Sequence, residues 1–193
     1  MLNLRKCGHK DLERYYSLLE MDFAKEEIIS KLSLHRALLN GSAELLVVYD
    51  EESSLEVAYA LVLTKNLYGY VLLKYMAVLP WYRGKGVGIA AMRLINKRYA
   101  DRQGIIAELT SFEDEDGSMI KGLRKFFARF GYVVVDSDYR IGGPVELMVK
   151  PIRGTFEIEP VEHRIIRDFY TRVLNPFAMD KMIDIRPVRK PEE

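Results

Sequence analysis

The sequence predicts a mixed α/β fold, in which a mostly antiparallel sheet with one parallel strand pair is flanked by helices. Three observations support this prediction. Helical periodicity covers the first forty residues, β-rich apolar runs follow as far as residue 79, and a helical stretch then separates two apolar runs between residues 70 and 110. A strand–helix–strand unit brings its two strands together in parallel, whereas short turns join antiparallel neighbours.

The N-terminal half is expected to contain a weak strand, two helices and three strands. After the weak strand at Leu2–Lys6, apolar side chains recur at helical spacing over 10–23 and again over 28–39, where Asn40-Gly41 supplies a helix stop. Three β-rich runs follow, at 44–49, 55–64 and 70–79, and short polar segments join them. We expect them to form an antiparallel meander.

The remaining chain is expected to contain helix, strand, helix and two strands, followed by a C-terminal addition. The expected elements are a helix over about 86–102, a strand at 105–110, a helix that ends at Gly131, and strands at 132–136 and 145–150. One further helix near 160–174 would cover a pocket or contact a second subunit of a homodimer. We therefore expect a domain over 1–150 and a helical appendage with a charged tail over 151–193.

Composition excludes several classes of protein. The 193 residues carry 29 Lys and Arg against 28 Asp and Glu, a net charge of +1, which argues against a nucleic-acid binder held mainly by phosphate electrostatics. One cysteine and three histidines cannot form a disulfide or, by themselves, a spaced zinc site, so no metal is expected. The chain shows neither a long apolar run nor a signal-peptide pattern, and we expect a cytoplasmic protein with no membrane partner.

The clearest local feature is the turn Pro80-Trp-Tyr-Arg-Gly-Lys-Gly-Val-Gly88, between an apolar run and an amphipathic helix. Its three glycines permit positive φ and close backbone approach. Their amide hydrogens stand at a helix N-terminus, where the helix dipole favours an anion. Arg83 and Lys85 are expected to add mobile cations. The pattern predicts a site for a diphosphate-like group.

Other interpretations of this turn must be weighed. A P-loop is excluded because Gly84-Lys85 is followed by Gly86 and not by Ser or Thr. Gly86-Val-Gly-Ile-Ala-Ala91 satisfies a relaxed dinucleotide pattern, with Glu108 as the acidic residue beyond it, yet residues 80–85 intervene where that pattern should begin at the strand end. A dinucleotide site and a plain tight turn remain as alternatives.

Arg83-Gly-Lys-Gly-Val-Gly88 is similar to the Arg/Gln-x-x-Gly-x-Gly/Ala signature of the GNAT superfamily of N-acetyltransferases. The preceding Met76-Ala-Val-Leu-Pro80 resembles the strand and turn of that family, and Lys125-Phe-Phe-Ala-Arg-Phe-Gly-Tyr132 resembles its late aromatic segment. The order of elements over about 1–150 is similar as well. Signature and element order together make the resemblance specific.

The resemblance implies that the two parallel strands splay apart and that the pantetheine arm of acetyl-CoA enters between them. It implies transfer of the acetyl group to a primary amine of a small molecule or peptide, by direct attack in a ternary complex. The residues implied to hold acetyl-CoA are Met76, Ala77 and Val78 on the strand, and, around the pyrophosphate, the amides of Arg83, Gly84, Lys85, Gly86, Val87, Gly88 and Ile89.

Direct acyl transfer needs an acceptor for the amine proton and help for the departing thiolate. Glu108 is the candidate base, because this carboxylate interrupts the apolar run 105–109 on the strand expected beside the cleft. A solvated position on the outer face of that strand is the alternative. The acidic run Glu113–Asp116 is expected to be a solvated loop that attracts a cationic amine.

The chain departs from the family pattern at the candidate acid. Many members have a tyrosine where this chain has Phe127, which has no hydroxyl, and the family's Asn-x-x-Ala spacing is replaced by Ile120 and Leu123. Tyr139, expected in a loop near the cleft, is the candidate acid in its place. The same departures favour a second hypothesis, a non-catalytic acyl-CoA-binding or sensing module.

Overall fold

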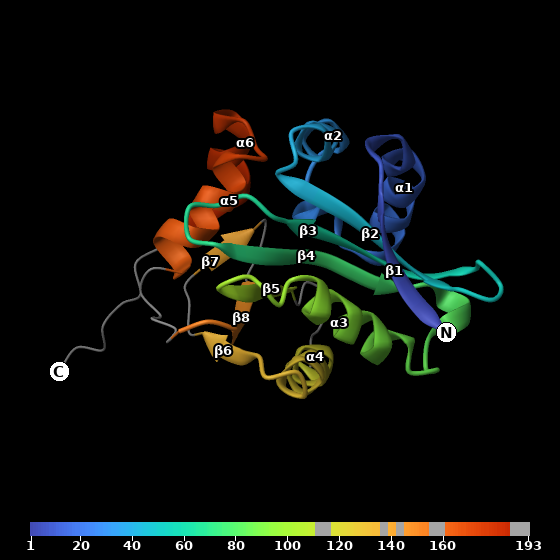
Figure 1. Ribbon diagram of the computed structural model, residues 1–193. Coiled ribbons are helices and arrows are strands. Elements are labelled where there is room, and N and C mark those ends of the chain that lie inside the picture. The colour runs from blue at the N-terminus through green and yellow to red at the C-terminus, as the bar shows by residue number, and fades with distance from the viewer. Residues whose placement is uncertain (111–116, 136–138, 142–144, 155–160, 186–193) are drawn as a thin grey trace.

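The computed structural model describes residues 1–110, 117–135, 139–141, 145–154 and 161–185, and Figure 1 shows its elements. A seven-stranded sheet lies at the centre of the molecule. Its strands in chain order are β1 (Leu2–Cys7), β2 (Ala43–Asp50), β3 (Glu56–Leu63), β4 (Tyr70–Val78), β5 (Gly104–Thr110), β6 (Val133–Val135) and β8 (Val145–Pro151). A separate two-stranded sheet pairs β7 (Tyr139–Ile141) with β9 (Ile183–Ile185).

Helices cover both faces of the large sheet (Figure 1). One face carries α1 (Leu12–Asp22), α2 (Lys31–Leu39) and α5 (Arg167–Thr171), and the other carries α3 (Val87–Arg98) and α4 (Ser118–Ala128). A π-helical turn, η4 (Val161–Ile166), precedes α5, and α6 (Pro176–Met182) follows it. Three 3-10 helices, η1 (His9–Asp11), η2 (Lys25–Glu27) and η3 (Pro80–Tyr82), precede α1, α2 and the glycine turn. None of the helices in the described ranges is long and apolar enough to cross a membrane.

The strand order β1-β2-β3-β4-β5-β8-β6 confirms the predicted fold class. β2, β3 and β4 form the antiparallel meander, and β4 and β5 are the parallel pair. Two expectations were wrong in detail. α3 ends at Arg98 and not near 102, and the backbone of Tyr139 lies in β7 opposite Ile185 and not in a loop.

The parallel pairing of β4 with β5 stops half-way along both strands. It runs from Tyr70 opposite Gly104 to Leu73 opposite Ala107, while β4 remains paired with β3 as far as Val78. The pairing ends at a β-bulge. Leu61 of β3 lies opposite Tyr75 and Val62 opposite Leu73, so Lys74 is the extra residue, and a bulge bends its strand away from regular pairing. Beyond the bulge, residues 74–78 of β4 and 108–110 of β5 are not paired with each other. We call this stretch the strand gap.

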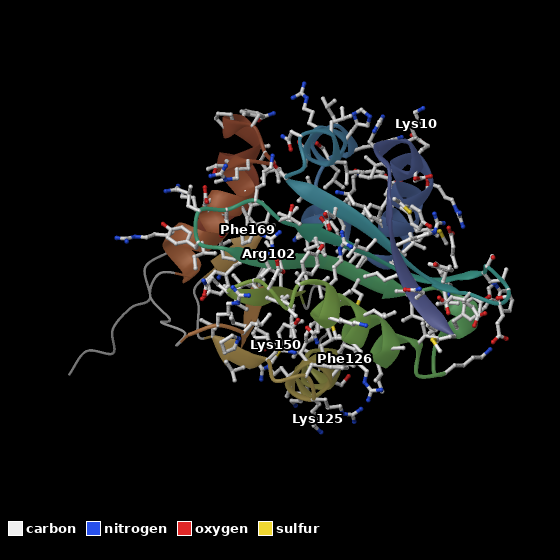
Figure 2. The ribbon with its side chains drawn as sticks, in the orientation of Figure 1. Lys10, Arg102, Lys125, Phe126, Lys150 and Phe169 are labelled. Atoms are coloured by element: carbon white, nitrogen blue, oxygen red, sulfur yellow. The ribbon has the colours of Figure 1, made fainter. Side chains whose placement is uncertain are left out.

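The C-terminal segment packs into the main core. Phe169 and Tyr170 of α5 are each 0% exposed and belong to the same apolar cluster as Tyr75 and Ile106 of the sheet. Figure 2 labels Phe169 where α5 meets the sheet. α5 therefore helps to form the core on the α1–α2 face of the sheet.

Candidate active site

The glycine turn presents unpaired amides at the start of α3. Gly84 has φ 74° and Gly86 has φ 76°, a left-handed conformation that strains any residue with a Cβ. Gly86 is the N-cap of α3, and the amides of 84–88 make none of the backbone hydrogen bonds found in the described part of the chain. The space where a Cβ would stand on either glycine is open to a distance of 4 Å. These amides can surround an anion at the positive end of the helix dipole.

Two of the amides assigned to the pyrophosphate from the sequence are already used within the turn. The N–H of Arg83 donates to the carbonyl of Pro80 at 3.3 Å, and the N–H of Ile89 donates to the carbonyl of Gly86 at 3.1 Å. The set of free donors is therefore narrower than expected and spans residues 84–88.

The side chain of Arg83 is held in place, which corrects the expectation of a mobile cation. Its Nε donates to the carbonyl of Val78 at 2.9 Å, and a terminal nitrogen donates to the Asp22 carboxylate at 2.7 Å. The other oxygen of Asp22 accepts a hydrogen bond from the Tyr59 hydroxyl at 2.8 Å. Arg83 therefore connects the end of β4 to the end of α1, and Lys85 is left as the cation that can reach a bound anion.

The first turn of α3 packs closely on the end of β4. A Cβ at Gly88 would stand 3.5 Å from Cγ2 of Val78 and 3.8 Å from the Phe126 ring, which is ordinary van der Waals contact, so α3 rests here on both β4 and α4. Figure 2 shows Phe126 on α4, on the side of that helix that faces α3. Close packing at this position keeps the free amides beside the strand gap.

Glu108 lies one residue beyond Ala107, the last residue of β5 that is paired with β4, and its side chain is 1% exposed. Its Oε2 accepts a hydrogen bond from Nζ of Lys74 at 2.7 Å, and the Lys74 side chain is also 1% exposed. The Tyr170 hydroxyl from α5 lies 2.9 Å from each carboxylate oxygen. The structure thus places the carboxylate inside the strand gap and not on the solvated outer face of β5.

A second buried carboxylate lies beside Thr110, at the end of β5. Glu27 of η2 is 5% exposed, and its Oε2 accepts a hydrogen bond from the Thr110 hydroxyl at 2.6 Å. The Tyr75 hydroxyl donates to the carbonyl of Glu27 and accepts from the amide of Ile29. Complete burial raises the pKa of Tyr75 well above its usual value. Tyr75 therefore stays protonated and fixes the segment between α1 and α2 against β4.

A cavity of about 480 Å³ opens between this segment, the end of β5 and α4. It is lined by Glu20, Met21, Asp22, Phe23, Ala24, Lys25, Glu26, Glu27, Thr110, Met119 and Leu123. Four of these side chains are carboxylates and one is a lysine, so the cavity favours a cation. Thr110 belongs to the strand gap, which links the cavity to Glu108 two residues earlier on β5.

A sequence model of the GNAT acetyltransferase domain matches residues 41–134, which include the meander, the glycine turn and Glu108. The chain therefore contains a match to the GNAT acetyltransferase domain over just under half of its length. This match supports an acyltransferase enzyme. No curated protein sequence is significantly similar to this chain.

Solved structures of GNAT proteins share the fold. A Bacteroides thetaiotaomicron protein assigned to the GNAT family superposes with a TM-score of 0.69 at 19% identity, covering 88% of this chain and 96% of that one. A dodecameric spermidine N-acetyltransferase from Vibrio cholerae gives 0.59 at 13% identity, covering 78% and 94%. Arabidopsis thaliana NAA60 with a bisubstrate analogue gives 0.59 at 14% identity, covering 80% and 100%.

The residues of the glycine turn and the strand gap fit acetyl-CoA, the donor that GNAT proteins generally use. The glycine turn offers amides and a free cation to a diphosphate, and the strand gap offers unpaired backbone to an extended arm. In the described ranges, no group of three or more His, Cys, Asp or Glu side chains is arranged to hold a metal ion.

Other residues singled out from the sequence have different positions in the GNAT fold. Phe127 is 6% exposed and packs edge-on against Phe126 and Tyr132. The Tyr132 hydroxyl lies 3.0 Å from Oδ1 of Asn96 on α3 and so belongs to the α3–α4 face. The side chain of Tyr139 and the acidic run Glu113–Asp116 lie outside the described residues.

Sequence reasoning missed Lys74, Tyr170 and Glu27. Lys74 had a signal, because a lone charge inside the apolar run 71–78 must find a partner when that run is a buried strand. Tyr170 had none, since its partner Glu108 is 62 positions away and nothing near it marks it among 12 tyrosines. Glu27 resembled any solvated residue of a polar helix end.

Proposed function

We propose that this protein transfers the acetyl group of acetyl-CoA to a primary amine of a cationic small molecule or peptide, by direct attack in a ternary complex. The observation that carries the proposal is the place of Glu108, in the strand gap and two residues from the acidic cavity. Acetyl-CoA supplies an activated thioester. The protein's task is to bind both substrates, to accept the amine proton and to exclude water.

The donor would be held by backbone groups. The amides of 84–88 would bind the diphosphate, and Lys85 would add a charge. Met76, Ala77 and Val78 remain the proposed contacts for the pantetheine arm, because β4 is unpaired with β5 at these positions. The carbonyl of Val78 already accepts a hydrogen bond from Arg83. Successive residues of a strand direct their backbone groups to opposite edges, and the Leu79 amide donates to Val57 of β3, so the groups of Ala77 also face β3. The hydrogen bonds to the arm are therefore assigned to the backbone groups of Met76 and to the amide of Val78.

The acceptor would enter through the acidic cavity. Asp22 is held by Arg83, and Glu27 is held by Thr110. Glu20 and Glu26 form no ion pair with any described residue. These two carboxylates are free to attract a cationic substrate. The spermidine acetyltransferase among the structural relatives acts on such a cation, which supports the choice of spermidine as a probe amine.

In the proposed reaction the neutral amine nitrogen bonds to the acetyl carbon, the carbon–sulfur bond breaks, and the amine proton passes through a water to Glu108. The thiolate of coenzyme A then takes a proton. Tyr139 is our candidate donor for that step, because Phe127 has no hydroxyl. We also propose a cytoplasmic location, in keeping with a free and buried Cys7, and a homodimer as the assembly.

Two variants test the donor side. We expect Gly86→Ala to weaken coenzyme A binding about tenfold or more, because alanine at φ 76° costs about 1–2 kcal/mol and turns the amides away. Gly122→Ala in α4, where a Cβ has open space and φ is not positive, is the matched control and should bind normally. Calorimetry with coenzyme A and with NAD measures both, and binding of NAD alone would favour a dinucleotide site.

Turnover tests the function itself. Acetyl-CoA consumption is measured with spermidine, with a lysine-containing peptide and with a neutral primary amine. We expect turnover that is highest with the cationic amines. Tight binding of coenzyme A with no turnover on any of them would support the non-catalytic module instead.

A further inference from the structure

We propose that Tyr170, from the C-terminal helix α5, is a positioning residue for Glu108 and that α5 is therefore part of the acetyl-transfer site. This inference rests on the proposed function, in which Glu108 accepts the amine proton. Residues 151–193 lie outside the segment matched by the GNAT sequence model, which ends at residue 134. The family match thus assigns no role to Tyr170.

The geometry of the hydroxyl is specific. It lies 2.9 Å from Oε1 and 2.9 Å from Oε2 of Glu108, so its single hydrogen is shared between the two oxygens. Nζ of Lys74 donates to Oε2 from the opposite strand of the gap. Two donors from two different elements fix the plane of the carboxylate. A carboxylate with fixed orientation presents its oxygens to a bound water in one way only.

The position of the hydroxyl is determined by α5 and not by the hydrogen bond alone. The Tyr170 and Phe169 side chains are completely buried in the sheet-facing core. Two residues before Tyr170, the Asp168 carboxylate accepts a hydrogen bond from the amide of Leu67 in the β3–β4 connection at 2.6 Å. It also pairs with Arg172 at 3.1 Å. α5 is thus anchored at the edge of the sheet, and Tyr170 projects from a fixed helix.

The charges around Glu108 explain why a hydroxyl is useful there. Lys74 and Tyr75 approach from β4, Tyr170 from α5, and Glu27 lies beyond Thr110. Lys74 places a positive charge 2.7 Å from the carboxylate, and burial keeps water away from both groups. A donated hydrogen bond from Tyr170 adds a second donor, from another element, beside Lys74. Its loss would leave a carboxylate that turns more freely.

The test compares Tyr170→Phe with Tyr99→Phe. Tyr99 is the matched control, because its hydroxyl also donates to a carboxylate that a cation holds, that of Glu44 at 2.8 Å, and because Tyr99 packs on the opposite face of the sheet from Tyr170. Two quantities are measured on the full chain labelled with ¹³C at glutamate carboxyl carbons. One is the chemical shift of the Glu108 carboxyl signal at pH 7, assigned by its absence in Glu108→Gln. The other is the pH profile of kcat and kcat/KM with spermidine.

We expect Tyr170→Phe to move the chemical shift of the Glu108 carboxyl signal at pH 7, because the carboxylate loses a donor that lies 2.9 Å from both of its oxygens. We expect kcat at pH 7 to fall several-fold and the pH profile of kcat/KM to change, with KM for acetyl-CoA unchanged within twofold. Tyr99→Phe should change neither the signal nor the profile. A KM for acetyl-CoA that stays unchanged would separate lost positioning from lost folding.

Two results would overturn the inference. One is a Glu108 carboxyl signal that has the same chemical shift in Tyr170→Phe and in the parent protein. The other is a shifted signal with an unchanged kinetic profile, which would make Tyr170 a purely structural contact. Absence of turnover in the parent protein with spermidine and the lysine peptide is a different failure. It would refute the proposed function, and the inference with it, whatever the carboxyl signal shows.

Discussion

Two carboxylates in this protein have the same kinds of partner and opposite surroundings. Glu44 accepts hydrogen bonds from Arg98, Lys6 and the Tyr99 hydroxyl, and Glu108 accepts them from Lys74 and the Tyr170 hydroxyl. The Glu44 side chain is 17% exposed and its partner Lys6 is 48% exposed, whereas Glu108 and Lys74 are each 1% exposed. Glu44 stands where β2 is paired with β3 on one side, and Glu108 stands where β5 has lost β4.

The difference shows what the strand gap adds. Around Glu44 the backbone is paired with β3 and water screens the charges. The hydrogen bonds of Glu44 therefore connect β1, β2 and α3 with only a modest gain in folding stability. Around Glu108 the charges are desolvated and every missing partner is costly. A buried ion pair is therefore a poor way to gain stability. Its position beside unpaired backbone and an acidic cavity is consistent with the chemical role that we propose for Glu108.

The largest expected effect is on turnover. Glu108→Gln removes the proton acceptor and should lower kcat with spermidine by about 10²–10⁴-fold, the range typical of general base catalysis. Glu44→Gln, at the other network, should leave kcat within about twofold. Steady-state kinetics at saturating amine between pH 6 and 9 measures both. Turnover of Glu108→Gln equal to that of the parent protein across this range would exclude Glu108 as the base.

The next effect is on stability. Lys74→Met leaves the buried Glu108 carboxylate without its cation and should cost about 3–5 kcal/mol of unfolding free energy. Lys6→Met leaves Glu44 with Arg98 and Tyr99 and should cost less than about 1 kcal/mol. Urea denaturation followed by circular dichroism measures the two losses.

A double variant sharpens this second comparison. Lys74→Met with Glu108→Leu removes both buried charges together, and we expect it to recover much of the loss seen in Lys74→Met alone. Equal losses for Lys74→Met and Lys6→Met would show that the strand gap is as well hydrated as the surface.

The parts of the proposed donor site could be recognised in the sequence because they are contiguous. The glycine turn shows free amides, helix start and cations within nine residues, and Glu108 is visible as a carboxylate in an apolar run. The acceptor side is assembled from segments that only the fold brings together. η2, the end of β5 and α5 meet through tertiary packing, and the hydroxyl of Tyr170 follows from the placement of a five-residue helix.

Details that depend on short elements were also beyond sequence reasoning. β7 and β9 have three residues each, too few for a period-2 pattern to stand out. The sequence shows Arg83 beside three glycines, which led to its interpretation as a mobile cation. The sequence does not show that its partner is Asp22, which lies 61 positions earlier. Local pattern thus identified the turn correctly and misjudged one side chain within it.

The smallest expected effect is the pH dependence of the Glu44 network. Burial alone would raise the pKa of Glu44, but hydrogen bonds from Arg98, Tyr99 and Lys6 outweigh it and hold the pKa below its usual value. Because the folded-state pKa is depressed, the network stabilises the protein fully above the unfolded value of about 4.3 and loses its effect as pH falls through the folded value. Glu44→Gln should therefore be less stable than the parent protein by about 1 kcal/mol at pH 6 and nearly equal to it at pH 3. Urea midpoints at pH 6, 5, 4 and 3 measure this difference. A difference that stays constant over the range would mean that Glu44 contributes by packing and not by charge, and its likeness to Glu108 would then be one of geometry alone.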